Sequence, residues 1–266
     1  MTSRRQFLAT SLGAGIAAGL SRVRAAGEPV IGMMFPPANY QVPPEARRLY
    51  PSGVTFLAEG LGLERMTPAE YDRIVPRIGP AARALKQRGA QAISIMGTSL
   101  TFYKGAAVHR RLLEQLHAAT GLPVSTMSQA VVDGLRAVGA KKVAVATAYD
   151  GEVNRRLKEF LIDEGFAVGA IDGFGITDFG GPARMGEQDI VDLSARVCAQ
   201  AGEPEGVLIS CGGLRTLGVA KPFEQRHGVP VVSSTPAAFW AAMRLVGESG
   251  KLTGYGRMLE ESAATV

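Results

Sequence analysis

One cysteine of this chain stands where a side chain could do chemistry. In the stretch GVLISCGGL, residues 206–214, Cys211 follows an apolar run and precedes two glycines. The run is typical of a buried strand, and ligands of open α/β sheets bind beyond the carboxyl ends of the strands. The stretch SIMGTSL, residues 94–100, has the same outline but carries Gly97 at the corresponding place. Cys211 and Gly97 are therefore candidates for one functional site.

Two structural roles for Cys211 are disfavoured. A buried core cysteine is the commonest kind, but Cys211 lies past the apolar run, next to Gly212 and Gly213. A disulfide would have to join it to Cys198, which lies late in the preceding helical segment and hence near the start of the strand. Roughly six strand residues of about 3.3 Å each separate the two levels, whereas bridged Cα atoms lie within roughly 7 Å. We interpret Cys198 as a small apolar residue of that helix.

Metal binding and nucleophilic catalysis lack partners in this sequence. The three histidines, His109, His117 and His227, are scattered in polar contexts, and the chain has neither a CxxC nor an HxxxH motif. His109 and His117 fall on one basic helical segment and are predicted to be solvated. No histidine is placed as the base of a cysteine hydrolase, and GxSxG is absent. The glycine-rich residues 173–181 lack the GK[ST] ending of a phosphate loop.

A proton donor is the remaining role for the Cys211 thiol. With an ordinary pKa of about 8.5, a thiol is mostly protonated at neutral pH and still ionises readily. Such a group can deliver a proton to a carbon atom and then be restored by solvent. We therefore expect acid catalysis by Cys211.

The segments around these candidates alternate in the manner of parallel βα units. Strands are expected at Val30–Phe35, Ala92–Met96, Val124–Met127, Lys142–Ala148, Ala167–Gly173, Gly206–Ser210 and Val229–Ser233. Helical periodicity is clearest in Tyr71–Arg88, Ala106–Thr120, Ala130–Val138, Glu152–Glu164, Gln188–Ala201 and Ala237–Val246. These segments predict an α/β protein.

The order of the elements nearly repeats along the chain. A helix, a candidate site stretch, a further helix and a GxPV strand occur once around Gly97 and again around Cys211, with the GxPV motifs starting at Gly121 and Gly228. Two pseudo-equivalent lobes would place Gly97 and Cys211 on opposite sides of one cleft. We assign residues 27–127 with 237–262 to lobe 1 and residues 128–236 to lobe 2. The alternative, that successive βα units merely look alike, stays open.

The basic character of the chain comes from its first residues. The net charge is +5 and the pI is near 9.4, but residues 1–26 hold four arginines and no acidic residue, and the remainder is nearly balanced. No nucleic-acid partner is therefore expected.

Residues 1–26 have the features of a twin-arginine signal peptide. Arg4 and Arg5 precede an Ala/Gly-rich run from Phe7 to Leu20, which is too short to span a bilayer, and Val23-Arg24-Ala25 offers a cleavage site after Ala25. This leader predicts export to the periplasm, with no membrane association after cleavage. The alternatives are a disordered basic tail or an uncleaved anchor helix.

Several motifs in the same order resemble the arylmalonate decarboxylase family of the aspartate/glutamate racemase superfamily, which also includes maleate isomerases and hydantoin racemases. They are GLGL at 60–63, TPAEYD at 67–72, MGTSLTFYKGAA at 96–107, ATAY at 146–149, SCGGL at 210–214 and VPVVSSTPAAFW at 229–240. The resemblance extends from IGMMFPP at 31–37 to GYGRMLEES at 254–262. It implies two pseudo-symmetric Rossmann-like lobes, each with a mainly parallel four-stranded sheet flanked by helices, and an active site in the cleft between them.

The resemblance also implies a reaction. In the racemases and maleate isomerases each lobe supplies one cysteine, because racemisation needs a base on one face of the carbon and an acid on the other. Decarboxylation makes its carbanion by loss of CO₂ and needs a single acid. Glycine at position 97 with cysteine at position 211 is the decarboxylase arrangement.

Roles for individual residues follow from the resemblance. Cys211 would protonate the enediolate carbon, and Gly97 would leave room for the planar aryl or alkenyl group. Thr98, Ser99 and Tyr149, with backbone N–H groups of Ser99, Cys211 and Gly212, would bind the retained carboxylate. The leaving carboxylate would face an apolar pocket formed by Pro36, Leu63, Met66, Tyr71, Phe179 and Pro182.

Plainer interpretations of these residues stay open. Thr98 and Ser99 could cap the helix that follows them, and Tyr149 could be ordinary packing. Pro36-Pro37 could form a simple turn, and Leu63 and Met66 could belong to the core. Met66, Phe179 and Pro182 also depart in size from the aliphatic residues usual in the family, so the resemblance does not fix the size of the substrate.

These observations favour cofactor-independent decarboxylation of α-aryl or alkenyl malonates to optically active monoacids, without metal, biotin or thiamine. The expected partner is a small malonate-type dicarboxylate, and a monomer is favoured. One alternative is a racemase or maleate isomerase relative, which Gly97 disfavours. The other is a non-catalytic periplasmic carboxylate-binding protein.

Overall fold

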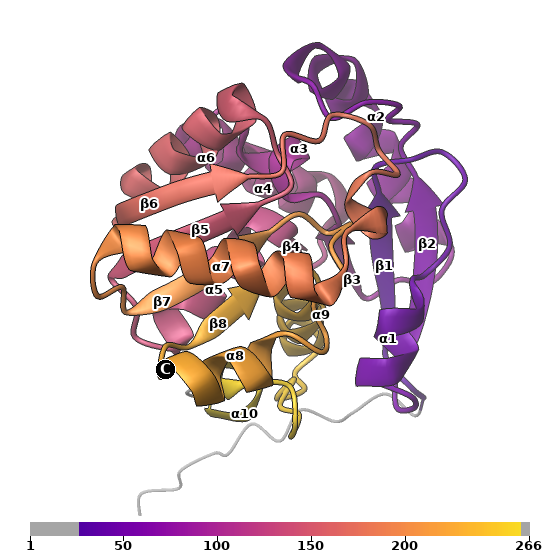
Figure 1. Ribbon diagram of the computed structural model, residues 1–266. Helices are drawn as coiled ribbons and strands as arrows, with labels where there is room; N and C mark the ends of the chain where they lie inside the picture. The colour runs from indigo at the N-terminus through magenta and orange to yellow at the C-terminus, as the bar shows by residue number, and fades with distance from the viewer. Residues whose placement is uncertain (1–26, 262–266) are drawn as a thin grey trace, which may run out of the picture.

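Two all-parallel four-stranded sheets form the framework of the protein. The computed structural model describes residues 27–261, so the predicted signal peptide lies outside the described residues. The first sheet has the order β2-β1-β3-β4, and its strands are Val30–Phe35 (β1), Thr55–Gly60 (β2), Ala92–Ile95 (β3) and Val124–Thr126 (β4). The second has the order β6-β5-β7-β8, with strands Lys142–Thr147 (β5), Ala167–Gly173 (β6), Gly206–Ser210 (β7) and Val231–Ser233 (β8). Figure 1 shows helices around both sheets, which confirms the predicted fold class.

Six of the ten α-helices in the described residues agree with the predicted periodic segments to within a few residues. The first half contains α1 (Pro44–Leu49), α2 (Pro68–Gln87), α3 (Thr98–Phe102), α4 (Ala106–Thr120) and α5 (Met127–Ala137). The second half contains α6 (Gly151–Asp163), α7 (Glu187–Ala201), α8 (Ala220–His227), α9 (Ser234–Leu245) and α10 (Arg257–Glu261), with a short 3₁₀ turn at Pro182–Arg184.

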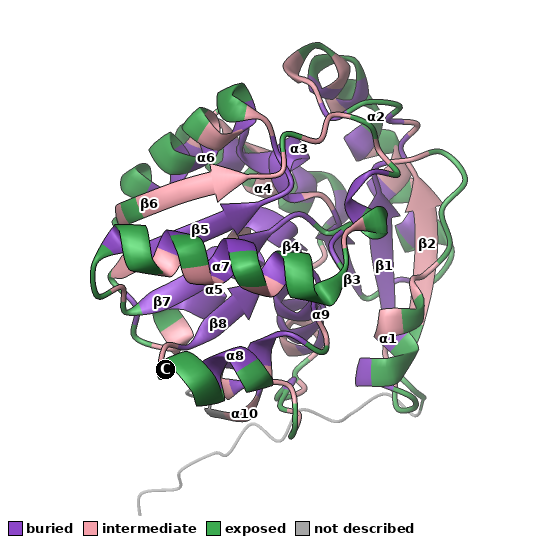
Figure 2. Ribbon diagram, in the orientation of Figure 1, coloured by how far each residue is buried: buried purple, intermediate pink, exposed green. Residues whose placement is uncertain are grey.

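The edge strand β2 was missed from the sequence. It pairs with β1 on one side only, from Val30 opposite Thr55 to Phe35 opposite Gly60. Figure 2 shows β2 and β6, the first strands in the two sheet orders, as half-buried, whereas β1, β5, β7 and β8 are buried. A half-buried edge strand ending in Glu59 and Gly60 has neither the continuous apolar run of a central strand nor a regular alternation.

The two lobes exchange helices. Helix α5 follows β4 of the first sheet but packs against β7 and β8 of the second, and α9 follows β8 but packs against β3 and β4. The two helices also pack against each other, and the ring of Phe239 on α9 meets that of Phe56 on β2 edge-on at 5.2 Å. This exchange joins the lobes through apolar contacts. The predicted residue limits of the lobes stay a prediction.

Within residues 27–261, no helix combines the length and apolar character that crossing a membrane would require.

The prediction that His109 is solvated is wrong. Its side chain is 1 % exposed, and Nε2 lies 2.7 Å from Thr126 Oγ1. The ring meets that of Phe160 on α6 edge-on at 5.4 Å, so it packs between the two lobes. Burial lowers the pKa of His109 to about 4. The basic neighbours Arg110 and Arg111 suggested an exposed helix, but the side facing β4 and α6 is covered.

Acid should destabilise the fold through His109. In the unfolded chain a histidine titrates near 6.5, so between pH 6.5 and 4 the unfolded state binds a proton that the folded state excludes. The stability conferred by neutral His109 is complete above pH 6.5 and is lost as the pH falls toward 4. Between pH 7.5 and 4.5, urea unfolding should show the wild type losing roughly 2 kcal/mol more than His109→Gln. An equal loss in both proteins would refute this assignment.

Candidate active site

A pocket lies between the carboxyl ends of the two sheets. The space free of protein atoms there, part of which is open to solvent, measures about 610 Å³. Ten of the predicted site residues line it: Pro36, Leu63, Met66, Gly97, Thr98, Ser99, Tyr149, Phe179, Cys211 and Gly212. All of the lining side chains are uncharged. A carboxylate bound here must therefore rely on hydroxyl and N–H donors.

Tyr71 and Pro182 lie next to the pocket without lining it. Tyr71 is fully buried, with its ring 4.8 Å from that of Tyr103, and its hydroxyl has no hydrogen-bond partner among the described residues. Pro182 packs beside Gly213, where an added Cβ would lie 3.0 Å from the proline ring. Both residues support the wall of the pocket from behind.

Some pocket residues were missed from the sequence. Tyr40 lines the pocket from the loop after β1, with its ring 4.5 Å from that of Phe35. Thr235 and Met127 line it from the starts of α9 and α5. The signal was available for Tyr40, because its loop follows the carboxyl end of a buried strand.

The backbone at Cys211 is strained. Its φ is +140°, in a region that residues with a side chain rarely adopt, and such strain is characteristic of functional sites. Three hydrogen bonds stabilise the conformation: Cys211 N–H donates to Ser234 Oγ (3.3 Å), and its carbonyl accepts from Leu214 N–H (3.2 Å). The third joins Gly213 N–H to Cys211 Sγ at 3.5 Å. The N–H of Cys211, predicted to bind the carboxylate, therefore already has an acceptor in this structure.

Equivalent hydrogen bonds fix the two site loops. Ser128, the second residue of α5, donates from Oγ to the carbonyl of Thr98 at 2.9 Å. Thr235, the second residue of α9, donates from Oγ1 to the carbonyl of Gly212 at 3.1 Å. Thr98 follows Gly97 and Gly212 follows Cys211, so the repeat predicted from the sequence extends to single contacts around the pocket.

Close packing explains the glycine at position 97. A Cβ built there would lie 2.8 Å from Pro36 Cγ, closer than real Cβ contacts. Gly97 also precedes α3, whose start has no side-chain capping hydrogen bond. The capping interpretation of Thr98 and Ser99 therefore fails. Instead, Thr98 Oγ1 donates to Ser234 Oγ at 3.0 Å.

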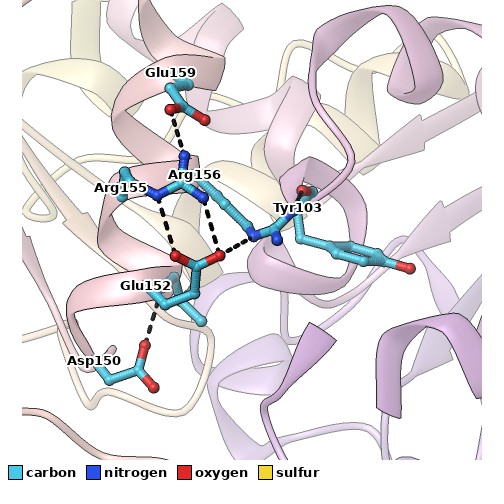
Figure 3. A network of polar contacts seen from close by, with 7 residues as sticks. Tyr103, Asp150, Glu152, Arg155, Arg156 and Glu159 are labelled. Carbon is cyan, nitrogen blue, oxygen red and sulfur yellow. Dashed lines mark hydrogen bonds and ion pairs between the residues drawn. The ribbon is translucent and has the colours of Figure 1, made fainter. Parts of the chain in front are cut away.

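A polar network on α6 fixes the far end of α3 (Figure 3). Arg156 donates from Nη1 to the carbonyl of Tyr103 at 3.0 Å, and its Nε donates to Glu152 at 2.8 Å. Asp150 caps the start of α6 by accepting from Val153 N–H at 2.9 Å. Because Tyr103 is the C-terminal cap of α3, an arginine of the second lobe positions the helix that carries Thr98 and Ser99.

Burial keeps the Cys211 thiol protonated. The residue is 8 % exposed, and desolvation raises its pKa to about 11, although the backbone N–H groups of Gly213 and Leu214 oppose the shift. Burial also raises the pKa of Tyr149, whose hydroxyl lies 3.3 Å from Ser210 Oγ. At neutral pH both groups are therefore neutral proton carriers. In the described part of the chain, no group of three or more His, Cys, Asp or Glu side chains is arranged as a metal site.

A two-lobed α/β fold with one thiol in the pocket between the lobes defines an aspartate/glutamate racemase-like protein. The family model described as arylmalonate decarboxylase matches residues 31–259. An arylmalonate decarboxylase of Bordetella bronchiseptica is 46% identical over 241 residues, which cover 90% of this chain and all of that protein. The chain therefore belongs to the arylmalonate decarboxylase family.

Solved structures agree with this assignment. The crystal structure of arylmalonate decarboxylase superposes with a TM-score of 0.80 at 46% identity, covering 88% of this chain and all of the other. A liganded double mutant of that enzyme, glycine to cysteine and cysteine to serine, gives a TM-score of 0.86, again at 46% identity and with 88% and 100% coverage. Its two exchanged positions have the same separation along the chain as Gly97 and Cys211. A maleate isomerase of Pseudomonas putida S16, at 22% identity with a TM-score of 0.80 and coverage of 88% and 99%, shares the fold.

Alkylation should report the raised pKa of Cys211. In a Cys198→Ala background, the rate of modification by iodoacetamide should rise with pH and show its inflection near pH 11, because the thiolate is the reactive form. Mass spectrometry of the labelled peptide measures this rate. An inflection at or below about pH 8.5 would show that the thiol is not desolvated.

Proposed function

We propose that this protein decarboxylates α-aryl or α-alkenyl malonates without a cofactor and releases an optically active monocarboxylic acid. The observation that carries the proposal is the pairing of one protonated thiol, Cys211, with a glycine at position 97 in an uncharged pocket. Membership of the arylmalonate decarboxylase family supports the substrate class.

Hydroxyl and N–H donors of the pocket would bind the retained carboxylate. The donors in this proposal are the hydroxyl groups of Thr98, Ser99 and Tyr149 and the backbone N–H of Gly212, all from residues that line the pocket. As CO₂ leaves, the electron pair of the broken C–C bond moves into the retained carboxylate and forms an enediolate. Fixed donors that meet this growing charge lower the barrier, and removing one such donor typically costs about 3–4 kcal/mol.

The leaving carboxylate would face apolar side chains. Leu63, Met66 and Phe179 also line the pocket, and their side chains have no hydrogen-bond donor. A carboxylate without partners is destabilised relative to neutral CO₂, so this environment favours loss of the group. The bulk of Met66 and Phe179 limits the space on this side, while the planar aryl group lies beside Gly97 and is conjugated with the carbanion.

Cys211 would then protonate the enediolate carbon. The S–H bond breaks, its proton forms the new C–H bond, and the thiolate regains a proton from water. Gly213 N–H, 3.5 Å from Sγ, supports the transient thiolate. Because a single thiol approaches from one face, the product has one handedness.

The central test is turnover of phenylmalonate by the protein from residue 27 onward. Phenylmalonate should release CO₂. From 2-methyl-2-phenylmalonate, chiral chromatography should show a single enantiomer of 2-phenylpropionate. Cys211→Ala should lose at least about 100-fold in kcat, the lower end of the contribution of a positioned acid. Cys198→Ala, which removes the other thiol, should stay active. Tight binding of these malonates without CO₂ release would indicate a carboxylate-binding protein, and absence of both would refute the substrate class.

A second thiol should restore chemistry on the opposite face. Gly97→Cys should racemise 2-phenylpropionate weakly, since Pro36 must shift to admit the new Cβ. Gly97→Ala is the matched control, because it meets the same proline contact but offers no thiol, and should not racemise. Unchanged optical purity of 2-phenylpropionate after prolonged incubation with Gly97→Cys would contradict the opposed placement of positions 97 and 211.

We also propose that the protein is exported by the twin-arginine route and acts in the periplasm as a monomer. The support for export is the leader itself, in which Arg4 and Arg5 precede a short apolar run and a small-residue cleavage site at Ala25.

A further inference from the structure

One buried hydroxyl joins the two halves of the site from behind. Ser234, the first residue of α9, is 1 % exposed and does not line the pocket. Its Oγ accepts from Cys211 N–H at 3.3 Å and from the Thr98 hydroxyl at 3.0 Å. Thr98 follows the first sheet and Cys211 follows the second, so this oxygen links the carboxylate-binding hydroxyl of one lobe with the thiol loop of the other.

The fold alone does not require this hydroxyl. Ser128 and Thr235 make equivalent bonds to the two site loops, and the residues before them are Met127 and Ser234. The lobe that carries Gly97 therefore has a thioether at the place where the lobe that carries Cys211 has a hydroxyl. The difference accompanies the strained residue, because Cys211, at φ +140°, donates its N–H to this hydroxyl.

The directions of the hydrogen bonds at Ser234 indicate a second role for its hydroxyl. The Thr98 hydroxyl has one proton, which it donates to Ser234 in this structure. Ser234 in turn donates to the carbonyl of Ile209 over 3.5 Å, at the outer limit of hydrogen bonding. If Ser234 turns its proton to Thr98 Oγ1, it gives up only this long bond, and Thr98 is free to donate to a carboxylate in the pocket.

We propose that Ser234 is a positioning residue for the decarboxylation. It fixes the backbone of Cys211 by accepting its N–H, and it reverses its hydrogen bond with Thr98 so that Thr98 donates to the retained carboxylate. This role rests on the proposed function, because the carboxylate is the acceptor that makes the reversal useful.

The test compares Ser234→Ala with a matched control. Ser194→Ala removes another fully buried serine hydroxyl, which has no hydrogen-bond partner among the described residues and lies on α7, outside the pocket lining. On 2-methyl-2-phenylmalonate, Ser234→Ala should lower kcat by about 10- to 100-fold, the cost of a small misplacement at a reacting centre. Ser194→Ala should keep the wild-type kcat and KM.

A double-mutant cycle separates positioning from general stability. If Ser234 acts through Thr98, part of its effect should vanish in a Thr98→Val background. The loss of activity in the double variant, expressed as a free energy, should then be smaller than the sum of the two single losses. Fully additive losses, or a lowered melting temperature with unchanged kcat in Ser234→Ala, would overturn the proposal. Should Ser234→Ala not fold, Ser234→Cys, of similar size but with a weak donor and acceptor, should show the same loss of kcat, and wild-type kcat would again overturn it.

Alkylation of Cys211 supplies a readout that needs no substrate. In the Cys198→Ala background, Ser234→Ala should accelerate modification of Cys211 by about fivefold, the equivalent of one lost hydrogen bond. Ser194→Ala should leave the rate unchanged. If the wild type does not release CO₂, the proposed function fails and this comparison alone decides the role of Ser234 at the thiol loop. An unchanged alkylation rate would then refute it.

Discussion

The exchange of helices between the lobes is the constraint on which the site depends. Because α5 and α9 each start beside one site loop and pack across the lobe boundary, the loops at Gly97 and Cys211 cannot move apart without breaking a large apolar interface. Ser128 and Thr235 at the starts of these helices bind the following loop carbonyls directly. The packing of α5 and α9 across the lobe boundary therefore fixes the positions of the loops that carry Gly97 and Cys211.

The electrostatic properties of the pocket follow from the burial of its residues between the two lobes. Burial in a pocket whose lining side chains are uncharged raises the pKa of Cys211 to about 11, so the thiol keeps its proton at neutral pH. In the proposed reaction, the same lack of charge would disfavour a carboxylate without hydrogen-bond partners and strengthen each hydroxyl and N–H contact to the retained carboxylate. The three proposed parts of the site, which are the acid, the environment of the leaving group and the carboxylate site, therefore share one physical cause.

The elements that could be predicted from the sequence are those with a clear pattern of apolar residues. Three strands, including the one before Cys211, begin and end where the structure places them, and the near-repeat anticipated the two lobes. The sequence could not predict β2, whose stretch TFLAEG has neither a continuous apolar run nor a regular alternation, or the burial of His109, which depends on helix packing across the lobes. Ser234 was also beyond reach, because its importance arises from partners 23 and 136 positions away that only the fold brings together.

Pro36 has a consequence for how the two reaction types of this superfamily could interconvert. Its ring occupies the space that a side chain at position 97 would need. An evolutionary step from one thiol to two is therefore epistatic: the change at position 97 gains full effect only after the loop carrying Pro36 has been remodelled. Under the proposed mechanism, Pro36 therefore opposes the introduction of a second thiol at position 97 and so helps to preserve the handedness of the product.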